Sequence, residues 1–112
     1  NDTLIVRRLA ANSELFGIFG FSFLTENGDL IKATTVNGVE INLDTIQSYE
    51  YPIARPLFIY GKGEHKQITF GMQEFMDEYV SDAAVGEWGY LGDIGLVPLD
   101  PVKLEEVRLA VK

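Results

Sequence analysis

The sequence has 112 residues, enough for one small domain, and its 46% hydrophobic and 23% charged residues are typical of a globular protein. The formal net charge of −8 argues against nucleic acid or an anionic membrane as the main partner, because both require clustered Lys and Arg. The absence of cysteine excludes disulfides and thiolate chemistry. No apolar run approaches the roughly 20 residues that cross a bilayer. The first residues carry no signal-peptide pattern and no initiator methionine, which predicts a processed or truncated chain.

The first predicted element is a helix over Thr3–Ala11, with apolar residues on one face and two arginines near its C-terminal end. Asn12-Ser13 is expected to stop it. Phe16–Gly20 is predicted as a short buried strand whose glycines allow close packing of another element. Phe21–Glu26 either continues that strand or forms a short helix, because six residues are too few for periodicity to decide.

Two Asn-Gly pairs then indicate turns, Asn27-Gly28 and Asn37-Gly38. They flank Asp29–Val36, which is rich in Ile, Thr and Val and is predicted as a strand. The pattern therefore favours a hairpin-like arrangement. A short helix is predicted over Asp44–Tyr49, capped by its first residue with Gln47 as the capping partner.

The stretch Tyr51–Tyr60 is predicted to be extended and to connect two regions of the chain. Pro52 and Pro56 disfavour helical geometry in the residues before them. Phe58-Ile59-Tyr60 is rich in strand formers, but Pro56 has no N–H for a sheet ladder. A strand here must therefore start at the proline, run along a sheet edge, or leave one sheet for another. Gly61-Lys62-Gly63 is expected to end it.

The remainder of the chain is predicted to be helical. A long amphipathic helix is expected around one buried stripe, formed by Ile68, Met72, Phe75, Met76 and Tyr79. Ser81 is predicted to cap a second helix that carries Val85, Trp88 and Leu91 inward, weakened by glycines. After an extended link at Leu96–Leu99, Asp100-Pro101 supplies a cap and a first-turn proline. The final helix is expected to bury Leu104, Val107 and Val111.

The residue chemistry indicates no catalytic set. The only histidine, His65, is interpreted as a solvated surface residue, which leaves no histidine-rich metal site. The carboxylates of Glu74, Asp77 and Glu78 could form an acid/base pair or a cation site, but a solvated helix face is the better interpretation. Gly61-Lys62-Gly63 lacks the spacing of a phosphate loop.

Other candidates are weaker still. The serines at 13, 22, 48 and 81 lie in no nucleophile elbow. Trp88 and Tyr90 are expected to pack on the glycine-rich helix and not to line a ligand cage. Arg7, Asn12 and Ser13 have the composition of anion ligands, but none matches a ligand motif. The sequence therefore predicts no enzyme, no metal and no cofactor.

Four motifs nevertheless resemble a known family in a collinear order. They are Phe16-Gly17-Ile18-Phe19-Gly20-Phe21 followed by Asn27, then Val36-Asn37-Gly38-Val39, Tyr51-Pro52-Ile53-Ala54-Arg55-Pro56-Leu57-Phe58-Ile59-Tyr60, and Gly95-Leu96-Val97-Pro98-Leu99. The chain resembles the C-terminal third of the phosphate-binding proteins that supply phosphate ABC transporters. The match runs from about Thr3 to Lys112.

The resemblance implies an α/β fold, namely the C-terminal part of a two-lobed type II periplasmic binding protein with short mixed sheet pieces and flanking helices. It implies that residues 1–51 come from the second lobe, 52–61 cross the hinge, and 62–112 return to the first lobe. A periplasmic protein that binds inorganic phosphate and delivers it to membrane permease subunits is the implied function. The family's ligand motifs are expected upstream of residue 1, so no binding residue is assigned, and Arg55 is interpreted as a structural brace.

This interpretation leaves alternatives open. One is a related module that binds another oxyanion or acts as a sensor. Another is a self-contained interaction domain that uses its acidic helix face. If the chain holds parts of two lobes, side chains such as Phe16, Phe58 and Met76 stay exposed, at about 1.5–3 kcal/mol each. We then expect the isolated chain to associate with itself or with the missing N-terminal portion.

Overall fold

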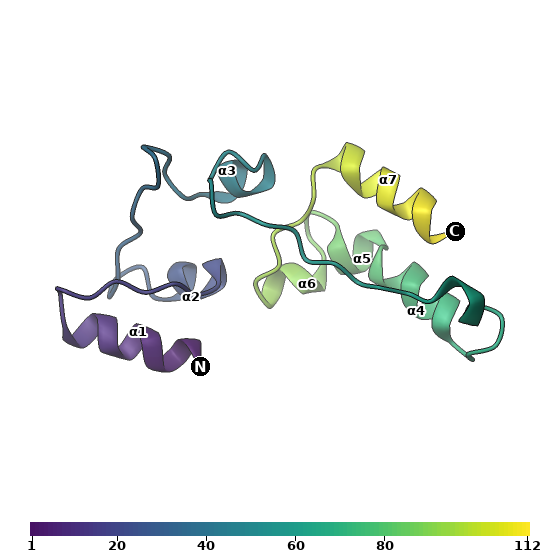
Figure 1. The fold of residues 1–112 in the computed structure, drawn as a ribbon, viewed down its shortest axis with the longest axis horizontal. Helices are drawn as coiled ribbons and strands as arrows, with labels where there is room; N and C mark the ends of the chain where they lie inside the picture. The colour runs from purple at the N-terminus through teal and green to yellow at the C-terminus, as the bar shows by residue number, and fades with distance from the viewer.

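The computed structural model describes all 112 residues and shows an elongated, helical molecule (Figure 1). Its principal extents are 53 × 27 × 23 Å and its Cα radius of gyration is 17.1 Å. A compact domain of this length would have a radius of gyration of about 13 Å. The chain therefore does not close around one central core.

Seven α-helices and one 3-10 helix make up the regular structure. In chain order they are α1 (Asp2–Ala11), α2 (Phe21–Glu26), α3 (Leu43–Gln47), η1 (Gly63–His65), α4 (Met72–Tyr79), α5 (Asp82–Val85), α6 (Tyr90–Asp93) and α7 (Pro101–Val111). Figure 1 shows α1, α2 and α3 at one end of the molecule and α4, α5 and α7 at the other. The chain between α3 and η1 runs from one group to the other as an extended ribbon.

The predicted α/β fold with sheet pieces is wrong for these residues. The β-structure consists of one isolated antiparallel bridge, between Val36 and Val39. Apart from Val36, which forms this bridge, the predicted strands have turn or irregular backbone and no ladder partner; they are Phe16–Gly20, Asp29–Val36 and Phe58-Ile59-Tyr60. A strand is stable only when a neighbour pairs with its N–H and C=O groups, and composition alone supplies no such neighbour.

The first third of the chain confirms the helix and turn predictions. α1 covers the predicted span and ends at Asn12, and Phe21–Glu26 adopts the helical alternative. Both Asn-Gly pairs form turns. Gly17 confirms the expected close approach, because a Cβ atom there would lie 2.7 Å from Cγ2 of Ile5. The same segment is not buried, however, since Phe16 is 86% exposed.

The cap of α3 differs from the prediction. Asn42, and not Asp44, is the N-cap: its side chain accepts a hydrogen bond from the Thr45 backbone N–H at 2.8 Å. The Thr45 hydroxyl completes the capping box by accepting from the Asn42 N–H at 3.0 Å. Gln47 takes no part in the cap. Its side-chain amide instead donates to the Pro98 carbonyl oxygen at 2.9 Å, which links α3 to the chain before α7.

The predicted long amphipathic helix is shorter than expected. α4 begins at Met72, after Gly71 adopts a left-handed φ of 77°, so Ile68 lies outside it. Ile68 and Phe75 are exposed and no residue of α4 is buried. The prediction of a buried stripe is therefore wrong, because too few other elements pack on α4 to cover its apolar face.

The predicted glycine-rich helix divides into α5 and α6. Ser81 caps α5 as predicted, accepting from the Ala84 N–H at 3.2 Å. The chain turns sharply after α5, and a Cβ atom on Gly89 would come within 2.2 Å of the Ala84 carbonyl oxygen. This turn directs Trp88 into solvent, where it is 93% exposed, so its predicted burial is wrong.

The small hydrophobic core lies where α7 packs beside α5. Asp100 caps α7 as predicted, accepting from the N–H groups of Val102 and Lys103 at 3.1 Å each. Leu104 is buried with Ala84 and Val85 and is ringed by the partly buried side chains of Tyr79, Leu91, Leu96 and Leu99. Val111 is also buried as predicted, whereas Val107 stays 38% exposed.

Arg108 fastens α7 to the junction of α4 and α5. Its Nε donates to the Val80 carbonyl oxygen at 2.8 Å, and its two terminal nitrogens bind Asp82 at 2.6 Å and Glu105 at 2.5 Å. The hydrogen bonds to Asp82 and Glu105 raise the pKa of the guanidinium further above its ordinary value. One planar side chain thus joins three places in the chain.

Candidate functional site

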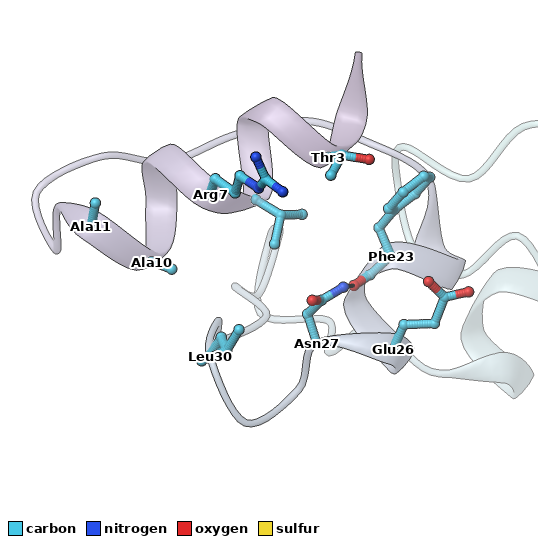
Figure 2. Close-up of a pocket in the computed structure, with 9 residues that line it drawn as sticks. Thr3, Arg7, Ala10, Ala11, Phe23, Glu26, Asn27 and Leu30 are labelled. Atoms are coloured by element: carbon cyan, nitrogen blue, oxygen red, sulfur yellow. Dashed lines mark hydrogen bonds between the residues drawn. The ribbon is translucent and has the colours of Figure 1, made fainter.

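The first candidate site is a groove of about 600 Å³ between α1 and α2. Figure 2 shows Thr3 and Arg7 on the α1 wall and Phe23, Glu26 and Asn27 on the α2 wall. Thr3, Arg7 and Ala10 share a wall because residues three and four apart lie on one helix face. This spacing is a signal in the sequence for the α1 wall of the groove, but it does not indicate the opposite wall.

The groove has few groups that could bind an anion. Arg7 is its single cation, and the Glu26 carboxylate in the same lining opposes a negative ligand. The Asn27 amide already donates to the Phe23 carbonyl oxygen at 2.9 Å. Phosphate sites in proteins bring together several N–H donors, commonly with a bidentate arginine. The groove lacks that convergence of donors.

A second cavity, of about 740 Å³, lies among α2, α3 and the chain after α6. Its charged lining residues are Glu26, Asp44 and Asp93, with no cation among them. Three carboxylates generate a potential that repels phosphate. The first turn of α3 faces this cavity, but the Asn42 side chain occupies its N3 donor. The cavity is therefore no better an anion site than the groove.

The structure does not bring the predicted anion-ligand candidates together. Arg7 lines the groove, while Asn12 and Ser13 do not. Asn12 accepts a hydrogen bond from the Glu14 backbone N–H at 3.0 Å through its side chain. Lys62, in the Gly-Lys-Gly stretch, forms an exposed ion pair with Glu64 at 3.7 Å. Such a pair contributes little to stability and leaves no preformed cradle.

Four further candidate residues are solvent-exposed. His65 lies exposed in η1, as predicted. Glu74, Asp77 and Glu78 are exposed on α4, as predicted for a solvated face. No group of three or more His, Cys, Asp or Glu residues has the geometry of a metal site.

Arg55 does not act as the predicted brace. It is exposed and makes no ion pair and no side-chain hydrogen bond in this structure. The segment around it is fixed at its start, where Tyr51 is buried and its carbonyl oxygen accepts from the Ala54 N–H at 2.9 Å. The predicted extended stretch thus begins with a turn and is irregular from Ala54 onward.

Tyr90 makes a polar contact that the sequence did not indicate. Its hydroxyl donates to Glu78 Oε1 at 3.3 Å, between residues twelve apart in sequence. Partial burial raises the pKa of the Tyr90 phenol, and the negative charge and hydrogen bond of Glu78 raise it further. This pair links α6 to α4 and points to no ligand.

A further feature is the apolar segment, which we define as Leu57–Tyr60. Leu57 and Tyr60 are 76% and 91% exposed, and Phe58 and Ile59 are exposed as well. Only the end of the stretch packs on a helix: a Cβ atom on Gly61 would lie 3.3 Å from the Met72 methyl group. Contiguous exposed apolar surface marks places where proteins meet other chains or ligands.

Comparison with curated proteins finds relatives of this chain. It is 35% identical over 94 residues to "Phosphate-binding protein PstS" of Staphylococcus epidermidis RP62A, and 34% identical over 94 residues to that of Staphylococcus aureus MRSA252. It is 31% identical over 84 residues to that of Staphylococcus saprophyticus. No protein-family model matches, and no solved structure matches.

The matches cover most of this chain but a minor part of each relative. They span 78% of this chain and 29% of the S. epidermidis and S. aureus proteins, and 70% and 26% for S. saprophyticus. The chain thus matches under a third of its relatives' length. The relatives' name describes binding and no reaction. None of the helices is long and apolar enough to cross a membrane.

Proposed function

This chain is homologous to part of the PstS family of phosphate-binding proteins, and from that premise we propose that it forms part of the solute-binding component of a phosphate importer. The observation that carries the proposal is the 35% identity over 94 residues. In this function the protein binds inorganic phosphate in the periplasm, on the outer side of the cytoplasmic membrane. It then presents the anion to ABC permease subunits and performs no chemistry on it.

The ligands for phosphate lie in other parts of the binding protein. Two features of this chain support that assignment. The α1–α2 groove offers one arginine opposed by a carboxylate, and the second cavity is lined by three carboxylates and no cation. Neither can compensate the cost of desolvating a phosphate anion.

The domain division is part of the same proposal. Residues 1–51 form part of one lobe, 52–61 cross between lobes, and 62–112 form part of the other. The separation of the α1–α3 group from the α4–α7 group along the molecule supports it (Figure 1). The separation is not complete, because the two groups touch where a Cβ atom on Gly95 would lie 2.3 Å from Cβ of Ser22.

Calorimetric titration tests the assignment of the ligands. The 112-residue chain is titrated with phosphate, sulfate and molybdate at equal ionic strength. We expect no saturable heat with any of the three anions. Saturable phosphate binding by these residues alone would show that the ligands lie within them.

A chimera tests the function itself. The matching portion of the S. epidermidis PstS protein is replaced by this chain, and the same three titrations are repeated. We expect saturable phosphate binding by the chimera. Binding of sulfate or molybdate in preference to phosphate would favour the module for another oxyanion. A folded chimera that binds none of them would favour an interaction or sensor domain.

A further inference from the structure

The two Asn-Gly pairs of this chain lie in different structural settings. Asn27 ends α2 and is half-buried, and its side-chain amide donates to the Phe23 carbonyl oxygen at 2.9 Å. Asn37 lies in an exposed turn, and its amide makes no hydrogen bond. The same dipeptide is thus anchored at one position and free at the other.

We propose that Asn37 is a site of spontaneous deamidation, and that Asn27 is protected from it. In this reaction the backbone nitrogen of Gly38 loses its proton and attacks Cγ of Asn37. The new N–Cγ bond forms as the Cγ–Nδ2 bond breaks and ammonia leaves, which gives a succinimide ring. Water then adds to one of the two ring carbonyls, and ring opening yields aspartate or isoaspartate. The step needs no co-reactant other than water.

The turn at Asn37 exposes both reacting groups. Asn37 and Gly38 have φ values of 51° and 79°, the pattern of a two-residue hairpin turn with both central residues left-handed. Gly38 carries no side chain, and even a Cβ atom placed there would meet nothing within 4 Å. The space beside the Gly38 Cα atom, next to the attacking nitrogen, is therefore open.

The turn can also open at low cost. It is closed by the two backbone hydrogen bonds between Val36 and Val39, both 3.0 Å long, and no strand extends beyond them. Exposed loops held by few hydrogen bonds open with small free energies, which allows the backbone nitrogen to approach Cγ. Deamidation at Asn27 requires a larger local opening, because the hydrogen bond of its side-chain amide must first break. The backbone there is also held in place, since the Asn27 carbonyl oxygen accepts from the Leu30 and Ile31 N–H groups at 2.9 and 3.1 Å.

The product differs from the starting chain in charge and in backbone length. The new carboxylate makes the formal net charge of −8 one unit more negative. Isoaspartate also adds a methylene to the main chain, so the turn can no longer keep both Val36–Val39 hydrogen bonds. Formation of isoaspartate therefore removes the one β-bridge of the molecule, whereas aspartate leaves the main chain unchanged.

Peptide mapping tests the proposal on the 112-residue chain. The protein is held at mildly alkaline pH below its unfolding temperature and digested with trypsin at intervals. Because Lys32 separates the two Asn-Gly pairs, they fall in different peptides and are quantified separately by mass spectrometry. We expect Asn37 to deamidate up to about tenfold faster than Asn27, because Asn27 must first break one hydrogen bond and Asn37 need not. Equal rates, a faster Asn27, or an Asn37 that stays intact would each overturn the proposal.

Two controls separate structure from local sequence. In denaturant both pairs should react at closely similar rates, because neither amide is then anchored. In the folded protein, Gly38→Ala should slow the reaction at Asn37 and leave Asn27 unchanged. If the rate ratio in denaturant equals that in the folded protein, the turn has no role and the proposal fails.

Discussion

Gly17 shows how one residue fixes the path of the chain over α1. The backbone passes so close to the helix that a Cβ atom on Gly17 would lie 2.7 Å from Cγ2 of Ile5 and 3.2 Å from Cδ1 of Leu9. Ile5 is β-branched, and its Cγ2 atom has little freedom to move aside. The missing side chain at Gly17 is therefore required for the approach.

We expect Gly17→Ala to reduce the free energy of unfolding by about 1–3 kcal/mol, the usual cost of overpacking. Gly63→Ala is the matched control, because its Cβ position is open and its φ is not in the left-handed region. Urea unfolding followed by circular dichroism measures both variants. If Gly17→Ala is no less stable than Gly63→Ala, the chain does not lie against α1 as described.

At the scale of elements, α7 depends on its buried face. Leu104 is 8% exposed and fills the space beside Ala84 and Val85. Leu109 is on the same helix but 68% exposed. The two leucines have the same helix propensity, so a comparison of their truncations isolates the effect of burial.

We expect Leu104→Ala to cost about 2–3 kcal/mol of unfolding free energy, near the low end for a buried leucine because the core here is small. Leu109→Ala should stay within about 0.5 kcal/mol of the parent, as most surface changes do. Thermal and urea unfolding of the two variants give the comparison. Equal losses from both truncations would contradict the packing of α7 on α5.

The elements that the sequence predicted correctly are those whose signals are local. Asp100-Pro101 predicts the start of α7, because it supplies an N-cap and a first-turn proline. Ser81 predicts the start of α5 as its N-cap in the same way. The cap of α3 was assigned two residues too late, since Asn42 and Asp44 can both cap a helix. The structure decides between them, because the Thr45 hydroxyl accepts from the Asn42 N–H and completes a capping box at Asn42.

The strand predictions failed because strands depend on partners elsewhere in the chain. Phe16–Gly20 and Phe58-Ile59-Tyr60 have strand-forming composition, but no segment of these 112 residues pairs with them. The α1–α2 groove was missed for a similar reason. The spacing of Thr3, Arg7 and Ala10 indicates one wall of the groove, but periodicity does not specify that α2 packs opposite that wall. The exposure of Phe16 and Phe58, in contrast, agrees with the expectation for a chain that lacks partner surface, whereas Met76 is half-buried and does not.

At the scale of the whole molecule, the small hydrophobic core favours association of the chain with other copies. Nine of the 112 residues are buried, and all four side chains of the apolar segment Leu57–Tyr60 are exposed, Leu57 and Tyr60 most of all. Removing such side chains from water stabilises an assembly by about 25 cal/mol per Å² of apolar surface. The net charge of −8 opposes association, but salt screens this repulsion.

We therefore expect the 112-residue chain to self-associate through the apolar segment, more strongly at 0.5 M than at about 0.05 M salt, since screening weakens only the repulsion. Sedimentation velocity over a concentration series measures the association. Phe58→Asp should shift the dissociation constant upward by about tenfold or more, because it places a charge within the buried contact. Trp88→Asp is the matched control: Trp88 is 93% exposed but lies outside the segment, so this variant should associate like the parent apart from its added charge. A monomer at every concentration, or equal weakening by both substitutions, would show that the segment does not join the copies.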